Sequence, residues 1–394
     1  MQLAYLFERF PAFSQTFCYR EVAELISQGA KIDIYSLRRP TGEPPQDWDE
    51  EIVRRVHYLP EEKPLIEEVH RLLRERRLAH VSGAIEDWGR KTDFLRLQQA
   101  VYVGSRLQDA GIHHVHAHFA GMAARTAYWI EKFFGIGFSF TAHANDIFAP
   151  RQFEIGLDKL VRNARLVVTE TDYAVEFLRG RFPDRADRIQ RIYNGLDLAE
   201  FRSGDLSAGV PTIISVGRLI EKKGFRYLID ACRLLNERAR SFRCEIIGDG
   251  PLETELRTQI EQFGLSHHVE LLGPKRQREI IDDLTAATVF ALPSVIDGEG
   301  GMDNLPSVIM EAMASGLPVI STPIGGIPEM VVENSTGFLV PPKDSASLAD
   351  AIEKVILDPP LARRLGENGH QRACELFAIE KSARALVGLF AAVG

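Results

Sequence analysis

The chain has 394 residues, of which 45% are hydrophobic and 26% are charged, and its formal net charge is −8 at pH 7. A single hydrophobic core stops growing at roughly 250 to 300 residues, so we expect two domains. The composition is that of a globular protein without a membrane-spanning segment, and the negative charge argues against nucleic-acid binding, which needs a basic stripe.

The N-terminal segment MQLAYLFERFP has no basic flank, and Glu8 and Arg9 interrupt its apolar run. It therefore predicts a buried strand rather than a secretory signal. The cysteines lack the CxxC spacing of a zinc site and do not form a disulfide framework, which favours the reducing cytoplasm. They are Cys18, Cys232, Cys244 and Cys374.

The first half of the chain alternates short apolar runs with amphipathic stretches. This alternation predicts βαβ units and a parallel sheet. The apolar runs are LAYLF (3–7), KIDIYSL (31–37), VHAHF (115–119), FSFTAH (138–143) and LVVTET (166–171).

The same rhythm restarts after residue 200, in TIISVG (212–217), CEIIGDG (244–250), VELLG (269–273), VFALPS (289–294) and PVISTP (318–323). We therefore predict an α/β protein with two Rossmann-like doubly wound domains that face each other across a cleft. The expected boundaries are 1–198 for the first domain and 199–375 for the second, with a C-terminal helix at 376–394 that packs back on the first domain.

Residues 64–80 form an amphipathic pattern that does not belong to the strand-helix rhythm. Leu65, Val69, Leu72 and Leu73 share one helical face, and Arg71, Arg74, Arg76 and Arg77 share the other. The segment is either an element that contacts an acceptor or a membrane surface, or an ordinary surface helix whose basic charge Glu67, Glu68 and Glu75 dilute.

Two basic residues follow the strand TIISVG directly. Arg218 and Lys223 lie five residues apart in a loop that opens the next helix. Ligands of open α/β sheets lie outside the carboxyl ends of the strands, and two cations beside a helix N-terminus suit a diphosphate. Solvated basic residues at the start of a helix would give the same pattern.

The segment DGEGGMDNLPSVIMEAMASGLPVISTPIGGIPE (297–329) combines a glycine-rich loop with a short helix. Glu311 lies one turn inside that helix among apolar residues, where an unpaired charge would be costly. Its carboxylate could accept hydrogen bonds from a ribose diol. A solvated surface glutamate is the alternative.

Histidines follow two of the predicted strands. His143 ends the run FSFTAH, just before Asn145 and Asp146, which suggests a polar role in the cleft, and His118 is a second candidate. His116 and His118 alternate on one strand, but no carboxylate stands at matching spacing, so we predict no metal site. Gly248 and Gly250 lack the third glycine of a dinucleotide fingerprint and predict a tight turn at the cleft. The alternative for each histidine is core packing or capping.

Several motifs together resemble a known family. SVGRLIEKKG, IIGDGPLETEL, ALPS and EAMASGLPVISTPIGGIPE look like the C-terminal domain of family-4 retaining glycosyltransferases of GT-B architecture, and YNGLDLAEF resembles their interdomain segment. FPAFSQTF, HVHAHFA and FSFTAHANDIF are similar to the branch that builds bacterial exopolysaccharides of the colanic-acid or amylovoran kind. The resemblance covers nearly the whole chain in order.

The resemblance implies roles for the candidate residues. Arg218 and Lys223 would hold the diphosphate, Glu311 would hold the ribose, and His143 would lie beside the reacting sugar. The backbone facing the donor would belong to Asn304, Leu305 and Pro306. The first domain would bind the acceptor and the second the nucleotide sugar.

This sequence departs from the family pattern at two places. The family pattern has two acidic residues separated by seven others, and Asp303 and Glu311 hold these places. The first of the two is normally Glu. Gln15 stands where the exopolysaccharide branch usually has Glu. The shorter Asp303 puts its contact with donor-sugar hydroxyls in doubt.

The implied activity is a metal-independent, retaining hexosyl transfer without a cofactor, from a UDP- or GDP-sugar to a glycan, expected to be a lipid-linked oligosaccharide. Catalysis would involve His143, Arg218, Lys223 and Asp303. We expect a cytoplasmic enzyme in peripheral contact with the inner face of the membrane. The alternatives are a sugar-nucleotide epimerase, a phosphorylase, or a non-catalytic regulatory homologue, which Gln15 and Asp303 keep open.

Overall fold

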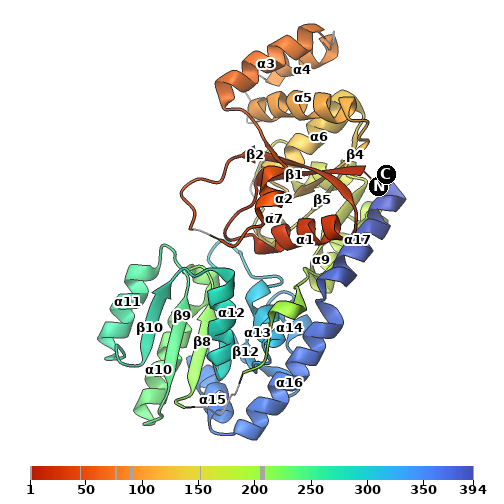
Figure 1. The fold of residues 1–394 in the computed structure, drawn as a ribbon. Coiled ribbons are helices and arrows are strands. Elements are labelled where there is room, and N and C mark those ends of the chain that lie inside the picture. Colours follow the sequence, from red (N-terminus) through yellow and green to blue (C-terminus); the bar gives the residue numbers. More distant parts are fainter. Residues whose placement is uncertain are drawn as a thin grey trace.

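The computed structural model describes residues 2–44, 46–75, 78–88, 93–150, 152–204 and 209–393. Within these residues the chain forms two separate sheets, each covered by helices (Figure 1). Every paired set of neighbouring strands is parallel. The predicted α/β fold with two Rossmann-like doubly wound domains is confirmed.

The first sheet has, in the described residues, the strand order β3-β2-β1-β4-β5-β6-β7. The order reverses direction between β1 and β4, and in such sheets ligands lie outside the carboxyl ends near this point. The strands are β1 (Gln2–Arg9), β2 (Lys31–Arg38), β3 (Val56–Tyr58), β4 (His114–His118), β5 (Gly137–Thr141), β6 (Leu166–Thr169) and β7 (Ile189–Arg191).

The second sheet has the order β10-β9-β8-β11-β12-β13 over the part of the chain that is described, and it reverses between β8 and β11. Its central strands are almost wholly apolar, as expected where both faces are covered. The strands are β8 (Thr212–Val216), β9 (Arg243–Ile247), β10 (Val269–Gly273), β11 (Val289–Leu292), β12 (Val319–Ser321) and β13 (Gly337–Leu339).

Helices cover both faces of the first sheet. In α1 the buried residues Cys18, Val22 and Leu25 recur at helical spacing and pack on one side of the sheet. Helices α5 and α6 cover the other side. The helices are α1 (Thr16–Ser27), α2 (Glu50–Arg54), α3 (Glu62–Glu75), α4 (Ala79–Trp88), α5 (Phe94–Asp109), α6 (Met122–Phe134), α7 (Ala144–Phe148), α8 (Leu157–Asn163) and α9 (Asp172–Arg181).

The second domain and the C-terminus contribute the remaining described helices. They are α10 (Phe225–Glu237), α11 (Glu253–Gln262), α12 (Gln277–Ala286), α13 (Ser307–Ala314), α14 (Ile327–Met330), α15 (Ser345–Ile356), α16 (Pro359–Leu376) and α17 (Ile379–Val393). Short 3-10 helices are η1 (Pro183–Arg188), η2 (Leu198–Glu200) and η3 (Glu221–Lys223).

The chain crosses between the domains twice, once between β7 and β8 and once between α16 and α17. Helix α17 packs against α1, and its Leu386 and Phe390 are buried in the hydrophobic cluster of α1 and β1, so the two ends of the chain lie close together (Figure 1). The crossings touch each other: Leu196 N–H donates to the Phe377 carbonyl at 2.7 Å, and Ile379 N–H donates to the Leu196 carbonyl at 3.0 Å.

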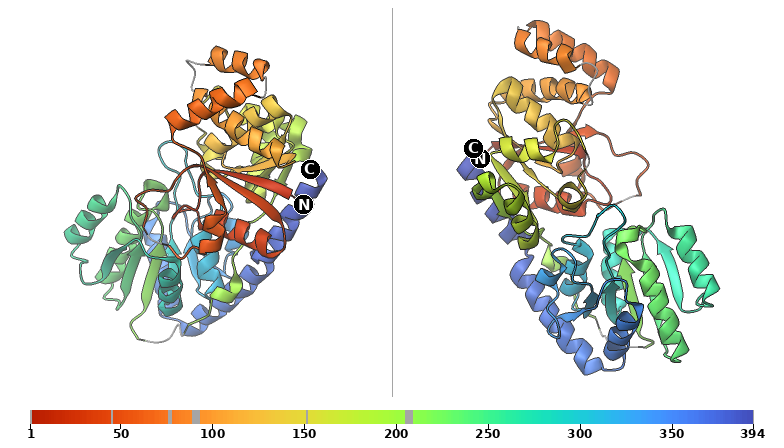
Figure 2. Two further views of the ribbon diagram at one scale, coloured as in Figure 1. Left: turned by 45° about the horizontal axis from the view of Figure 1, so that its top comes forward. Right: turned by 180° about the vertical axis from the view of Figure 1, so that it is seen from behind.

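Helix α3 lies at the end of the first domain that is remote from the second domain (Figure 2). Leu65, Val69 and Leu72 are buried in the cluster that α3 forms with α5. The apolar stripe predicted here therefore faces protein and is not available to a membrane. Arg71 pairs with Glu68 and Glu75, whereas the predicted Arg76 and Arg77 lie outside the described residues. Among the helices that can be described, none has the length and apolarity to cross a bilayer.

Candidate active site

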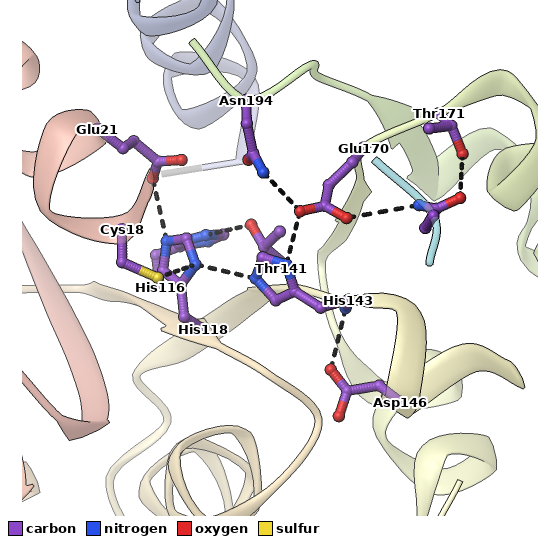
Figure 3. A network of polar contacts seen from close by, with 11 residues as sticks. Cys18, Glu21, His116, His118, Thr141, His143, Asp146, Glu170, Thr171 and Asn194 are labelled. Carbon is purple, nitrogen blue, oxygen red and sulfur yellow. Dashed lines mark hydrogen bonds and ion pairs between the residues drawn. The ribbon is translucent and has the colours of Figure 1, made fainter. Parts of the chain in front are cut away.

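Three neighbouring strands of the first sheet end in polar residues. His118 ends β4, His143 follows β5 as the N-cap of α7, and Glu170 follows β6. Because these strands are parallel neighbours, their carboxyl ends lie side by side and bring the three side chains together (Figure 3). All three are at most 5% exposed. The same rule of strand ends that identified both histidines would have identified Glu170, which sequence reasoning missed.

His143 lies at the centre of a chain of hydrogen bonds (Figure 3). Its Nδ1–H donates to Glu170 Oε1 at 2.8 Å, and its Nε2 lies 3.3 Å from His118 Nδ1. The other nitrogen of His118, Nε2, lies 3.1 Å from Glu21 Oε1. Cys18 Sγ lies 3.4 Å from His118 Nδ1. Glu21 and Cys18 come from α1, which local sequence patterns identified only as amphipathic.

The charge of His143 depends on its carboxylate neighbours. Burial acts to lower the pKa of His143, but Glu170, Asp146 and Glu21 together outweigh burial, and the pKa lies above its ordinary value. Burial likewise acts to raise the pKa of Glu170, but His143 and the hydrogen bonds from Asn194 and Asn304 hold this pKa below its ordinary value. Both shifts favour the charged forms, so the two side chains form a buried ion pair whenever His143 is protonated.

His116 belongs to the same strand as His118 but has a different role. Its Nδ1 lies 2.8 Å from Ser139 Oγ and its Nε2 lies 3.0 Å from Thr141 Oγ1. Burial holds its pKa well below the ordinary value, so His116 is neutral. This histidine packs within the sheet.

Asn304 connects the second domain to this network. Its Nδ2 donates to Glu170 Oε2 at 3.4 Å, and its Oδ1 accepts from Thr171 Oγ1 at 2.6 Å. The predicted donor-facing segment thus reaches the first domain through the side chain of Asn304. Leu305 and Pro306 are buried beside it, and Pro306 is the N-cap of α13.

The second domain brings Lys223 and Asp303 into contact. Lys223 Nζ lies 2.8 Å from Asp303 Oδ2, and Lys222 Nζ lies 3.7 Å from Asp303 Oδ1. Burial acts to raise the pKa of Asp303, but the two lysines and Ser294 hold it below its ordinary value. Burial foremost lowers the pKa of Lys222. Sequence reasoning selected both partners of the 2.8 Å pair without predicting that they pair.

Arg218 is exposed in the loop after β8, directly beside the turn after β9. The two loops bond through their backbones, because Leu219 N–H donates to the Asp249 carbonyl at 2.7 Å. Gly248 and Gly250 permit this approach: a Cβ on Gly248 would lie 1.9 Å from the Gly217 carbonyl oxygen, and one on Gly250 would lie 2.6 Å from that of Leu219. Both glycines shape the loop that presents Arg218.

Glu311, 2% exposed in α13, has a partner across the domain interface. Arg20 Nη2 on α1 donates to Glu311 Oε1 at 2.8 Å. The Nη1 atom of Arg20 is buried and has no hydrogen-bond partner among the described residues. Arg20 was not predicted from the sequence, because its partner is 291 positions away.

Two family models match the chain in succession: Glycosyltransferase Family 4 over residues 14–200 and Glycosyl transferases group 1 over residues 199–372. A putative colanic acid biosynthesis glycosyltransferase of Escherichia coli K12 is 45% identical over 160 residues, which is 40% of this chain and 39% of that protein. The amylovoran biosynthesis glycosyltransferase AmsK of Erwinia amylovora is 45% identical over 137 residues, 35% of this chain and 34% of that one. These matches thus span less than two fifths of each relative.

Solved structures match over nearly the full length. Sucrose-phosphate synthase from Thermosynechococcus elongatus superposes with a TM-score of 0.73 at 20% identity, covering 99% of this chain and 98% of that chain. Anabaena HepE in complex with UDP superposes with a TM-score of 0.74 at 18% identity, covering 100% of both chains. At this identity the likeness concerns the fold.

Proposed function

Since this chain belongs to the family-4 glycosyltransferases of GT-B architecture, we propose that it transfers a sugar from a nucleotide diphosphate donor to a hydroxyl of a glycan. The observation that carries this proposal is the convergence of the His143–Glu170 ion pair with Asn304 of the second domain. A sugar bound between the domains at this point would touch a charged imidazole.

The donor is proposed to be a UDP- or GDP-sugar bound mainly by the second domain. Arg218 and Lys223 bind the diphosphate, with the turn of Gly248 and Gly250 beside them. On binding, Lys223 exchanges the Asp303 carboxylate for an oxygen of the diphosphate, whose two phosphoryl groups together carry two negative charges. Asp303 keeps its hydrogen bond from Ser294 Oγ at 2.9 Å.

The ribose is proposed to bind at Glu311. To reach both hydroxyls of the diol, the carboxylate must share or release Arg20, so binding of the nucleotide alters a contact between the domains. The backbone from Asn304 to Pro306 leads directly into α13, the helix that carries Glu311, and faces the donor in this arrangement.

The transfer itself is proposed to retain the anomeric configuration by front-face departure. The diphosphate leaves as the acceptor hydroxyl approaches from the same side, and the leaving phosphate oxygen takes the hydroxyl proton. Arg218 and Lys223 stabilise the charge that grows on this oxygen, so fixed cations do the work that a metal ion does in other transferases. His143 exchanges its 3.3 Å contact with His118 Nδ1 for a hydrogen bond from its Nε2–H to the donor sugar, and domain closure excludes water.

Product analysis tests this function against its alternatives. We expect release of the nucleotide diphosphate only when a UDP- or GDP-sugar and a glycan acceptor are both present. The NMR spectrum of the product should show that the transferred sugar keeps the anomeric configuration it had in the donor. Conversion of donor alone would instead indicate an epimerase, and phosphate-dependent cleavage of a glycan would indicate a phosphorylase. Donor binding without turnover across a broad acceptor panel would indicate a regulatory homologue.

Replacing Glu311 with Gln is expected to weaken binding of the free nucleotide diphosphate by about tenfold, because a neutral amide is a poorer acceptor for the diol than a carboxylate. Calorimetry measures the affinity of the parent and the variant for the nucleotide diphosphate directly. The control is Glu329→Gln, because Glu329 also bonds across the domain interface, to the Asp172 and Tyr173 amides. Equal affinity of the parent and Glu311→Gln would show that Glu311 does not bind the ribose.

The acceptor is proposed to be a lipid-linked oligosaccharide, since the relatives named for colanic acid and amylovoran synthesis make exopolysaccharides. The buried stripe of α3 leaves only charge for membrane contact. We therefore expect weak flotation with anionic vesicles at low salt, none with neutral vesicles, and loss of binding as salt screens the charges. Binding that persists at high salt would contradict an electrostatic contact.

A further inference from the structure

Three potential ligand atoms point toward one spot beside the candidate active site (Figure 3). They are Cys18 Sγ, His118 Nδ1 and His143 Nε2, and all lie within 4.8 Å of one another. The sulfur lies 3.4 Å from His118 Nδ1, which lies 3.3 Å from His143 Nε2. Tetrahedral zinc, with bonds of about 2.3 Å to sulfur and 2.0 to 2.1 Å to nitrogen, separates such ligands by roughly 3.3 to 3.6 Å.

The far side of each imidazole bonds to a carboxylate. His143 Nδ1 bonds to Glu170 at 2.8 Å, and His118 Nε2 bonds to Glu21 at 3.1 Å. Histidines that bind metals almost always donate their second N–H in this way. These bonds would keep protons on the far nitrogens, so an ion that displaces the proton between the two imidazoles finds a lone pair on each near nitrogen.

The local charge favours a dication. A Cys18 thiolate with the carboxylates of Glu21 and Glu170 would supply three negative charges in a buried region. The alternative group formed by Glu21, His116 and His118 is less suitable, because both nitrogens of His116 already bond to hydroxyls. Cys18 with the two histidines is therefore the better ligand set.

We propose that Cys18, His118 and His143 form a binding site for a thiophilic divalent cation such as zinc, and that an ion bound there inhibits sugar transfer. The ion displaces the thiol proton of Cys18 and the proton between the imidazoles to solvent, and it binds the sulfur and two nitrogen lone pairs. The inhibition rests on the proposed function, because the ion would occupy the Nε2 atom that His143 offers to the donor sugar. Magnesium, which prefers oxygen ligands, should not bind.

Zinc binding to the full chain tests the site without any assay of transfer. After treatment with EDTA and desalting, the parent is titrated with zinc against a chromophoric chelator. We expect one zinc ion per chain from this site, loss of at least about a hundredfold in affinity in Cys18→Ser, and no response to magnesium. Cys18→Val preserves the apolar packing of α1 and should show the same loss if Cys18→Ser proves unstable.

Cys374 provides the matched control, because its Sγ lies 3.6 Å from His370 Nε2 on α16 and no third ligand is grouped with this pair in the described residues. Cys374→Ser should bind zinc like the parent. If the parent binds no zinc, or if both Cys18 variants bind it as tightly as the parent, the site does not exist.

Turnover tests the inhibition separately. Excess zinc should abolish transfer by the parent, EDTA should restore it, and each Cys18 variant should retain the rate that it shows without metal. If zinc binds through Cys18 but leaves turnover unchanged, the inhibition and the placement of His143 beside the sugar are both wrong. Absence of transfer under every condition would contradict the proposed function, while the titration would still decide the site.

Discussion

Lys223→Ala is expected to lower kcat by about a hundredfold or more, with a smaller effect on donor binding. Lys223 is proposed to stabilise charge that develops on the diphosphate only as the glycosidic bond breaks, and loss of one such preorganised group typically has an effect of this size. Arg218→Ala should lower kcat to a similar extent. Unlike Lys223, Arg218 is exposed and pairs with no carboxylate in the described salt bridges.

The fold should survive Lys223→Ala, because Asp303 keeps Ser294 as a donor and Lys222 as a second cation. The free energy of unfolding in urea checks that the fold survives. Lys222→Ala is the control, because it removes a cation from the same carboxylate. Lys222 Nζ also lies 3.1 Å from Asn145 Oδ1, and this lysine is not proposed to bind the diphosphate. A folded Lys223→Ala enzyme with parental kcat would overturn the diphosphate assignment.

The second large effect is expected for Glu170→Gln, which removes the main group that raises the pKa of His143. Burial then has less opposition, so the pKa of His143 should fall and the neutral imidazole should be favoured. We expect kcat to fall by about a hundredfold, because the imidazolium no longer donates to the sugar. The free energy of unfolding should fall by about 1 to 3 kcal/mol, because the Gln oxygen can still accept from His143 and Asn194, which share Oε1 of Glu170, but its N–H group faces the amide donor of Asn304.

The pH dependence of stability separates this effect from simple packing damage. The pKa of His143 is raised in the folded state, so its contribution is fully present below the unfolded-state pKa and is lost as pH rises through the raised value. The pKa of Glu170 is lowered, so its contribution is present above the unfolded-state pKa and is lost as pH falls through the lowered value. Both contributions should disappear in Glu170→Gln.

A double-mutant cycle with His143→Gln provides the check on this interpretation. In the His143→Gln background, Glu170→Gln should no longer change the pH dependence on the alkaline side, because the group that titrates there is absent. Unfolding free energies from urea denaturation at several pH values supply the data. An equal alkaline effect in both backgrounds would mean that another group is responsible.

Most parts of this site that the sequence predicted follow a strand or open a helix in a repeating pattern, and Glu311 stood out as a charge among apolar residues. His118 and His143 were identifiable because parallel strands end at one edge of a sheet. Arg20, Glu21 and Cys18 were not, because they lie within α1, and their contacts depend on the three-dimensional placement of β4 and α13 against that helix. No local period encodes that placement.

The α3 stripe illustrates a different limit. The spacing of Leu65, Val69 and Leu72 correctly identified a buried face, but an amphipathic pattern states only that a face avoids water. Whether protein or lipid covers it depends on the neighbouring helix, here α5. Likewise, the sequence identified Lys223 and Asp303 separately, since a contact across 80 positions leaves no trace in local spacing.

The paired crossings near Leu196 and Ala378 restrict how the two domains can move. The two connecting segments are joined by backbone hydrogen bonds, and we expect them to act together as one hinge. Gly195 packs against Ile379 so closely that an added Cβ would lie 2.4 Å from the Ile379 Cα. A larger residue there would change the resting angle between the domains, and with it the rate of product release, without touching any group that binds the donor.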